Sequence, residues 1–227
     1  SGHYYARNQF MACMCRPGTK NNLNRGIYKS CNTYFSNVYR RIIDKANKVE
    51  ENINNWHKHL NSFGLGNYLG YDHPVGQPGY VPNANFYNLW YPNQRWRGST
   101  IVSNAIGQGE ILMTPIQLAN VAATIANRGF FYTPHFVKDI QGDFIDPKYK
   151  TKRATSISKE HFTNVIEGMA DVVSKGTARV AAIRGIEVCG KTGTIENFTK
   201  IDGVRTQLTD HSIFIAFAPK DDPKIAL

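Results

Sequence analysis

The stretch that decides the fold runs from residue 188 to residue 195 and reads Val188-Cys189-Gly190-Lys191-Thr192-Gly193-Thr194-Ile195. Its short apolar run predicts a strand, in which successive side chains point to opposite faces. Lys191 and Gly193 then share one face, while Thr192 and Thr194 share the other. Twist near the glycines would bring the cation and the hydroxyls towards one carboxylate, and Gly193 would let a substrate approach the backbone closely. The alternative is a strand with a glycine bulge and a solvated lysine.

A second polar pair, Ser30 and Asn32, stands in the segment Tyr28-Lys29-Ser30-Cys31-Asn32-Thr33-Tyr34-Phe35. The simplest interpretation is a helix start, with Ser30 or Asn32 as the N-cap. An apolar face follows at helical spacing, formed by Tyr34, Phe35, Val38, Ile42 and Ile43. A helix start also presents a hydroxyl and an amide together at a fixed edge, so capping and a functional role are compatible.

In this order, the two motifs resemble those of the penicillin-recognising serine transferases and hydrolases, which use Ser-x-x-Lys, then Ser-x-Asn, then Lys-Thr-Gly. Residues 106–110 and 114–119 look like the Gly-Gln-Gly…Thr-Pro-x-Gln-Leu-Ala stretch of class B penicillin-binding proteins. Residues 30–35 are similar to the variant of the elongation-type branch, penicillin-binding protein 2, and residues 211–219 resemble the strand that follows Lys-Thr-Gly. The resemblance extends from about Phe10 to Leu227.

The resemblance implies an α/β (α+β) fold of the penicillin-binding transpeptidase and serine β-lactamase type, in which helices flank an antiparallel sheet beside an all-helical subdomain. Residues 1–227 are then expected to form a partial transpeptidase domain that is cut at both ends. Within it, residues 32–63 belong to the helical subdomain and residues 186–227 to the sheet.

The reaction that the resemblance implies is acyl transfer through a serine ester in peptidoglycan D,D-transpeptidation. Ser30 would relay a proton to the departing amine, Asn32 would hydrogen-bond the donor peptide, and Lys191 would favour the substrate carboxylate. That carboxylate would be bound by the hydroxyls of Thr192 and Thr194. Beside Gly193, the N–H of Thr194 would contribute to the oxyanion hole. β-Lactams would be trapped as stable esters.

One motif is out of place. The single Ser-x-x-Lys of the chain, Ser156-Ile157-Ser158-Lys159, falls between the other two motifs instead of before them. A helix start explains it, with Ser158 as the cap of a helix that Gly176 closes. We therefore expect the nucleophile to lie upstream of residue 1 and the chain alone to be inactive.

Composition fits an envelope enzyme. A chain of 227 residues that is 41% hydrophobic can bury a proper core, and no apolar run approaches the length of a membrane span. The net charge of +10 comes from scattered basic residues, which favours an anionic envelope polymer or membrane surface over nucleic acid. The resemblance implies the periplasmic face of the inner membrane, with the anchor outside this chain. It also implies a membrane glycosyltransferase and elongation-complex proteins as partners.

The four cysteines indicate little. Cys31 and Cys189 lie inside the two site motifs and are expected near the cleft. Cys13 and Cys15, with His3, leave a metal or disulfide element open, although structural zinc needs four ligands. The prediction is that the chain has neither a metal site nor a cofactor.

Periodicity predicts helices over 32–63, over 115–128 with Thr114 as the cap, and over the stripe Phe162, Val165, Ile166, Met169, Val172 and Val173. Residues 64–112 predict a long connection past the cleft, and 130–155 predict short strands and turns. Strands are expected at 186–195, 211–218 and from 224 onward, with the second buried on both faces.

Two other functions stay open on the sequence alone. A serine β-lactamase shares all three motifs but hydrolyses the ester quickly. A non-catalytic β-lactam sensor or scaffold module would acylate without crosslinking peptidoglycan.

Overall fold

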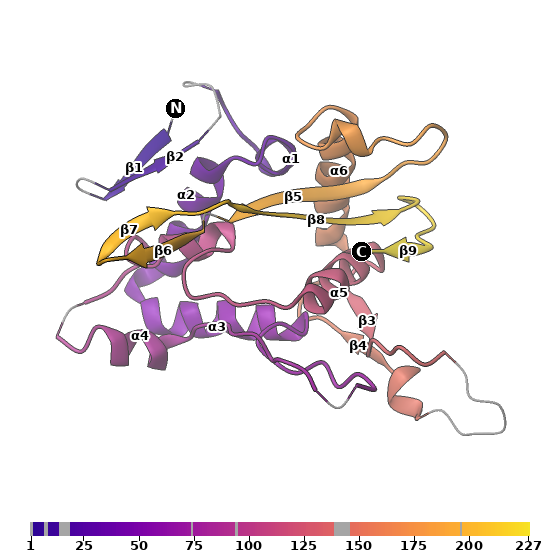
Figure 1. The fold of residues 1–227 in the computed structure, drawn as a ribbon, viewed down its shortest axis with the longest axis horizontal. Helices are drawn as coiled ribbons and strands as arrows, with labels where there is room; N and C mark the ends of the chain where they lie inside the picture. The colour runs from indigo at the N-terminus through magenta and orange to yellow at the C-terminus, as the bar shows by residue number, and fades with distance from the viewer. Residues whose placement is uncertain are drawn as a thin grey trace.

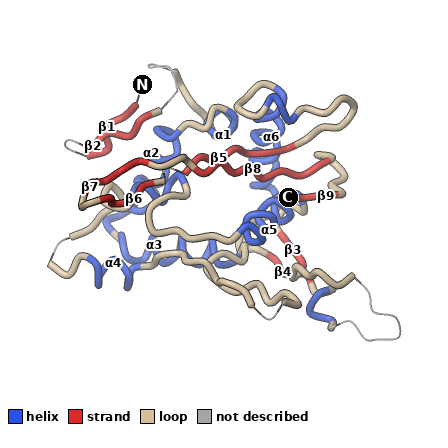
Figure 2. Tube along the Cα trace, in the orientation of Figure 1, coloured by secondary structure: helices blue, strands red, loops and turns tan. Residues whose placement is uncertain are grey.

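The computed structural model describes residues 2–6, 9–13, 19–73, 75–93, 95–138, 146–195 and 197–227. Helices and antiparallel strands form a mixed α/β fold, in which a three-stranded sheet lies against helix α6 (Glu160–Ser174), and further helices lie below the sheet (Figures 1 and 2). The predicted fold class is confirmed.

The main sheet has the order β5-β8-β9, all antiparallel. Its strands are β5 (Cys189–Ile195), β8 (His211–Ala218) and β9 (Ile225–Ala226), which match the three predicted strands. β8 was expected to be buried on both faces, but only Ala216 and Phe217 are buried. The first half of β8 extends towards the hairpin of β6 (Phe198–Ile201) and β7 (Val204–Gln207), where the core no longer covers it (Figure 1).

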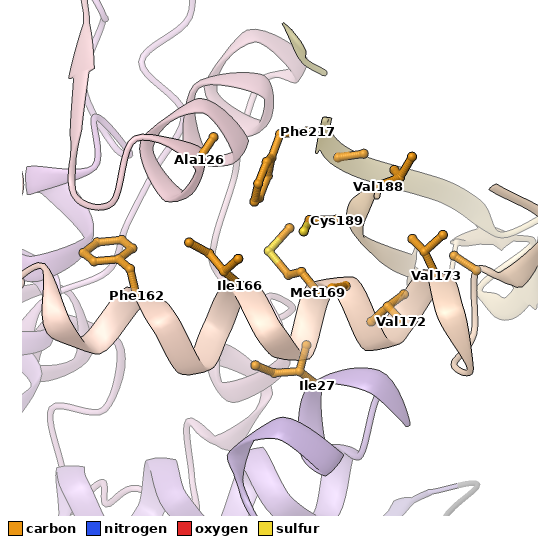
Figure 3. Packing of buried hydrophobic residues seen from close by; sticks show 13 residues of the cluster. Ile27, Ala126, Phe162, Ile166, Met169, Val172, Val173, Val188, Cys189 and Phe217 are labelled. Atoms are coloured by element: carbon orange, nitrogen blue, oxygen red, sulfur yellow. The ribbon is translucent and has the colours of Figure 1, made fainter. Parts of the chain in front are cut away.

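The larger core cluster forms where α6 packs between the sheet and α1 (Leu23–Tyr28). Figure 3 shows Ile166 and Met169 pointing to the sheet, near Phe217 and Cys189, while Ile27 contacts the other side of α6. The predicted apolar stripe of α6 is therefore confirmed. Ser158, however, does not cap α6: Lys159 occupies the N-cap without a side-chain bond, and the main-chain oxygen of Ser158 accepts from His161 N at 3.1 Å.

Residues 32–63 are helical but interrupted. α2 (Asn32–Ile43) and α3 (Val49–Ser62) are separated by the short 3-10 turn η1 (Lys45–Asn47), where φ is 54° at Ala46 and 57° at Asn47. Asn52 Nδ2 holds this turn by donating to the carbonyls of Ile43 and Lys45, at 3.0 and 2.8 Å. A second buried cluster joins α2 and α3 to α4 (Ala84–Trp90) and contains Tyr39, Ile43, Ile53, Ala84, Tyr87, Trp96 and Ile101.

Helix α5 (Pro115–Ala126) begins as predicted. Thr114 and Gln117 form a capping box, and Pro115 opens the first turn. The helix was expected to pack on apolar residues nearly all round. Its most buried positions are instead partly polar, because Gln117 Nε2 donates to the carbonyls of three loop residues, Gly64, Asn67 and Pro78, at 2.8–3.2 Å. Gln117 thereby pins the loop that follows α3.

The connection over residues 64–112 contains more regular structure than predicted: α4 and the 3-10 helix η2 (Val102–Ile106). Asn104 on η2 is buried and donates to the hydroxyls of Tyr39 and Tyr87, at 3.3 and 2.6 Å. Tyr87 in turn donates to Glu110 at 2.8 Å. This network fastens the connection to α2.

The remaining short elements are β1 (Gly2–Ala6) paired with β2 (Gln9–Ala12), β3 (Phe130–Tyr132) paired with β4 (Lys152–Ala154), and the 3-10 turns η3 (Pro147–Tyr149) and η4 (Arg179–Ala181). The β3–β4 pair confirms the strands and turns predicted over 130–155. No helix in the described ranges has both the length and the apolar character needed to cross a bilayer.

Candidate active site

Strand β5 lies at the edge of the main sheet and carries the Lys-Thr-Gly motif. It pairs with β8 in continuous antiparallel register, with Lys191 opposite Ile215 and Gly193 opposite Ile213. Within the described residues no strand pairs with its other edge, so backbone N–H and C=O groups of β5 remain available there. An extended peptide can add to such an edge by main-chain hydrogen bonds.

Ser30 occupies the tight turn between α1 and α2. Its φ is +49°, a left-handed conformation that costs a non-glycine residue about 1–2 kcal/mol. The turn is held by two backbone bonds, from Ser30 N to Ile27 O at 3.0 Å and from Cys31 N to Gly26 O at 2.9 Å. The sequence predicted Ser30 or Asn32 as the cap of α2, and this prediction was wrong. Cys31 is the N-cap, and it makes no side-chain cap bond. The turn leaves the Ser30 hydroxyl free of capping.

The two motifs meet in space. Lys191 Nζ donates to Ser30 Oγ at 2.9 Å, and also to the carbonyl of Thr192 at 2.6 Å. This contact joins the turn before α2 to the edge strand, so the structure places the two motifs side by side. That they form one catalytic site stays a prediction.

Two glycines, Gly168 within α6 and Gly176 just after its end, bring Ser30 this close to the sheet. A Cβ on Gly168 would lie 2.8 Å from Ile27 Cδ1, and a Cβ on Gly176 would lie 2.6 Å from the main-chain oxygen of Tyr28. Glycine is therefore needed at both positions for α1 to pack directly on α6. Since Ser30 follows α1 immediately, this packing sets the position of its hydroxyl.

Lys191 is half-buried, and no carboxylate in the described part of the chain pairs with it. Burial disfavours the charged ammonium and lowers the pKa of Lys191 below its ordinary value. An uncompensated cation beside a hydroxyl is suited to bind a substrate carboxylate. It also donates to Ser30 Oγ, which leaves the Ser30 proton available for transfer.

The other motif residues of β5 differ in their surroundings: Thr192 has a hydrogen-bond partner, whereas Gly193 and Thr194 are exposed. Thr192 Oγ1 hydrogen-bonds the hydroxyl of Thr177, which follows the end of α6, at 2.9 Å. Among the described residues, a Cβ on Gly193 would meet nothing nearer than Ile213, at 4.0 Å, so none of these neighbours requires glycine there. Thr177 was missed by the sequence analysis, since its only signal was a hydroxyl residue just after the helix-ending glycine.

Asn32 is the first residue of α2, and in the described part of the chain its side chain hydrogen-bonds neither Ser30 nor Lys191. Its Nδ2 donates to the carbonyl of Ala12 on β2 at 3.2 Å. The structure thus brings Ser30 and Lys191 together and places Asn32 at the edge of this pair, against the β1–β2 hairpin.

Cys31 and Cys189, which the sequence places inside the two motifs, are both fully buried. Burial raises the pKa of Cys189 to about 12, so this thiol is inert at neutral pH. Cys31 Sγ lies 3.6 Å from Cys13 Sγ. No group of three metal-binding side chains occurs among the described residues. Cys15 and the side chain of His3 lie outside them, so the metal or disulfide alternative stays open.

Ser156, the serine of the misplaced Ser-x-x-Lys, lies elsewhere. Its Oγ contacts His59 Nδ1 at 2.6 Å and Ser62 Oγ at 3.0 Å, both on α3. Ser156 precedes α6, whereas Thr177, which contacts Thr192, follows it. Fifteen helical residues separate the two ends by about 22 Å. Ser156 therefore does not belong to the Ser30–Lys191 site.

Comparison with known proteins agrees with this geometry. The family model described as the penicillin binding protein transpeptidase domain matches residues 4–227. This chain belongs to that family, and its relatives are of the class B, penicillin-binding protein 2 type.

Among curated proteins, the chain is 30% identical over 221 residues to the peptidoglycan D,D-transpeptidase MrdA of Acinetobacter baumannii, covering 91% of this chain and 31% of that protein. It is 31% identical to MrdA of Haemophilus influenzae over 90% of this chain and 32% of that protein. The chain thus spans about a third of the length of these relatives.

Among solved structures, penicillin-binding protein 2 of Pseudomonas aeruginosa in complex with WCK 5153 matches with a TM-score of 0.76 and 28% identity, over 99% of this chain and 47% of that one. The complex of Helicobacter pylori penicillin-binding protein 2 with MreC matches with a TM-score of 0.71 and 28% identity, over 98% and 38% of the two chains.

Proposed function

We propose that the protein carrying this chain is a peptidoglycan D,D-transpeptidase of the elongation type, which crosslinks stem peptides through a serine acyl-enzyme and is acylated by β-lactams. The observation that carries the proposal is the 2.9 Å hydrogen bond from Lys191 to Ser30 at the open edge of β5. The relatives named peptidoglycan D,D-transpeptidase support it.

In this mechanism the donor peptide lies along the free edge of β5 as an added strand. Its terminal carboxylate is bound by the ammonium of Lys191 and by the hydroxyls of Thr192 and Thr194. The hydroxyl of Thr192 would either leave Thr177 and bind the carboxylate, or accept a hydrogen bond from Thr177 while it donates its own proton to the carboxylate. Gly193 leaves the strand surface open for the peptide.

Ser30 transfers the proton to the departing amine. Because Lys191 donates to Ser30 Oγ, the hydroxyl proton of Ser30 is directed away from Lys191, towards the leaving group. The N–H of Thr194 donates to the developing oxyanion, an interaction whose loss typically costs about 3 kcal/mol of barrier. Asn32, at the edge of the site, hydrogen-bonds the donor backbone.

The attacking serine is not assigned to any residue of this chain, because Ser156 is held by His59 and Ser62 at the far end of α6. We further propose that the protein works at the periplasmic face of the inner membrane with a membrane glycosyltransferase and elongation-complex proteins. The complex of a similar protein with MreC supports a partner of that kind.

The test is labelling with fluorescent penicillin, followed by crosslinking of peptidoglycan precursors. We expect the protein that carries this chain to be labelled and to crosslink, and the isolated 227-residue chain to remain unlabelled. Turnover of nitrocefin at tens per second (a typical catalytic rate) would instead indicate a β-lactamase. Labelling without crosslinking would indicate a sensor.

A further inference from the structure

A cavity of about 940 Å³ lies at the other end of α2 from Ser30, between the α2–α3 turn and the segment after α4. This volume is within the range of small-molecule sites, about 300–1,000 Å³. The residues that line it are Asp44, Asn47, Lys48, Val49, Glu50, Glu51, Asn88, Tyr91, Pro92, Arg95, Trp96 and Arg97. None of them belongs to the Ser30–Lys191 site.

The walls of the cavity are fixed by hydrogen bonds. Trp96 is buried, and its Nε1 donates to Asn88 Oδ1 at 2.9 Å. Asp44 Oδ1 accepts from Gly98 N at 2.8 Å and holds the opposite rim. Such a site is organised before a ligand arrives, which reduces the entropy lost on binding.

Several charged side chains of the cavity form no interaction with other described residues. Lys48 and Glu51 pair with each other at 2.9 Å, but among the described residues Glu50, Arg95 and Arg97 have side chains with neither an ion pair nor a hydrogen bond. A ligand with many hydroxyl and carbonyl groups would satisfy both the guanidinium donors and the carboxylate acceptor.

The charge of the lining selects the ligand class. Three acidic residues, Asp44, Glu50 and Glu51, oppose three basic ones, Lys48, Arg95 and Arg97, so the cavity favours neither a polyanion nor a polycation. The half-buried ring of Tyr91 adds aromatic surface, on which the C–H face of a pyranose ring can pack. An uncharged ligand with one apolar face and many hydroxyls is a saccharide.

We propose that this cavity binds a saccharide, namely a sugar segment of the glycan strand. The assignment rests on the proposed function, because stem peptides are attached to that glycan. The twelve residues of α2 place the cavity about 18 Å from Asn32. An extended peptide of five residues spans a similar distance, about 17 Å. The length of an extended stem peptide therefore matches the length of α2, at whose far end the cavity lies.

The test is titration calorimetry of the chain with a neutral tetramer of β-1,4-linked N-acetylglucosamine. We expect saturable binding that Arg97→Ala or Glu50→Gln weakens about tenfold, or about 1.4 kcal/mol. Both residues are exposed, so an unchanged thermal midpoint should show that each variant folds. The matched control is Arg184→Ala, an equally exposed arginine outside the cavity, which should bind as the original chain does.

The proposal is overturned if the tetramer does not bind, if the two cavity variants bind it normally, or if the same variants instead abolish binding of a sugar-free stem peptide. These results are separable from the penicillin test. Acylation without sugar binding removes the saccharide site alone, whereas sugar binding without acylation removes the proposed function and leaves the saccharide site.

Discussion

Lys191 Nζ and Ser30 Oγ are 161 positions apart in sequence and 2.9 Å apart in space. The bond links a left-handed turn to an edge strand, so neither element carries the site alone. The packing of α1 on α6 through Gly168 and Gly176 is what makes the bond possible. Predictions about the site therefore concern both the bonded groups and the surfaces that align them.

Lys191→Met should lower the rate of acylation by fluorescent penicillin about a hundredfold or more, because the removal of one pre-oriented donor costs about 3 kcal/mol of transition-state stabilisation. The measurement is the second-order labelling rate of the protein that carries the chain. Lys224→Met is the control, since Lys224 is exposed and pairs with the neighbouring Asp222 at 2.6 Å. If Lys191→Met labels within a few-fold of the unaltered protein, its proposed role is wrong.

The pH dependence of Lys191 has a defined sign. Burial lowers the pKa of Lys191 in the folded state. As the pH rises, activity that needs the ammonium should therefore be lost at a lower pH than it would be with an ordinary, solvent-exposed lysine. At pH values below this lowered pKa, Lys191 is charged in both the folded and the unfolded state, and the full cost of burying the ammonium lowers the free energy of unfolding. As the pH rises from the folded to the unfolded pKa, that cost is relieved. Urea unfolding should therefore show Lys191→Met more stable than the unaltered chain at neutral pH, by a margin that shrinks with rising pH.

A margin that is constant with pH, or that grows as the pH rises, would contradict this assignment. Lys224→Met again serves as the control, because it makes the same substitution at an exposed position.

The two glycines of β5, Gly190 and Gly193, should respond differently to substitution by alanine: one in stability and the other in acylation. A Cβ on Gly190 would lie 2.4 Å from Phe214 Cζ, so Gly190→Ala should cost about 1–3 kcal/mol of unfolding free energy. Gly193→Ala has open space, with the nearest atoms at 4.0 Å, and should change stability by less than about 0.5 kcal/mol. We nevertheless expect Gly193→Ala to slow acylation strongly, because the new methyl group occupies the surface that receives the peptide. Normal labelling of a stable Gly193→Ala variant would refute the proposed peptide path.

Thr177 is expected to position Thr192. Thr177→Val removes the 2.9 Å hydroxyl contact and should slow acylation about fivefold, corresponding to about 1 kcal/mol for one neutral hydrogen bond. Thr177→Ser keeps the hydroxyl and should restore the rate. If both variants behave alike, Thr177 acts only through packing.

The sequence predicted best those elements whose local chemistry and tertiary role agree. Thr114, Pro115 and Gln117 define the start of α5, and the α6 stripe and the three main strands are where periodicity placed them. The juxtaposition of the two site motifs came from family resemblance and not from spacing, because no local pattern encodes a contact across 161 residues.

The missed features have physical reasons. The interruption between α2 and α3 at Ala46 and Asn47 contains neither glycine nor proline, so no residue of the sequence marked it. The side chain of Asn52, which lies later in the chain, holds this turn instead. The role of Ser30 and Asn32 as caps was predicted wrongly because such residues are common at helix starts, whereas here Ser30 adopts a left-handed conformation and Cys31 occupies the N-cap position. The β6–β7 hairpin did carry a signal, Asp202-Gly203, and both residues have positive φ as such turns require.

The open edge of β5 has one more consequence. An unpaired strand edge is a template on which a second copy of the same protein can build a sheet, and a charged side chain on the edge strand is a common protection against it. Lys191 supplies that protection, and no carboxylate among the described residues neutralises it. We therefore expect the lysine that attracts a peptide carboxylate to discourage self-association at the same edge, so that solubility and substrate recognition depend on one ammonium group.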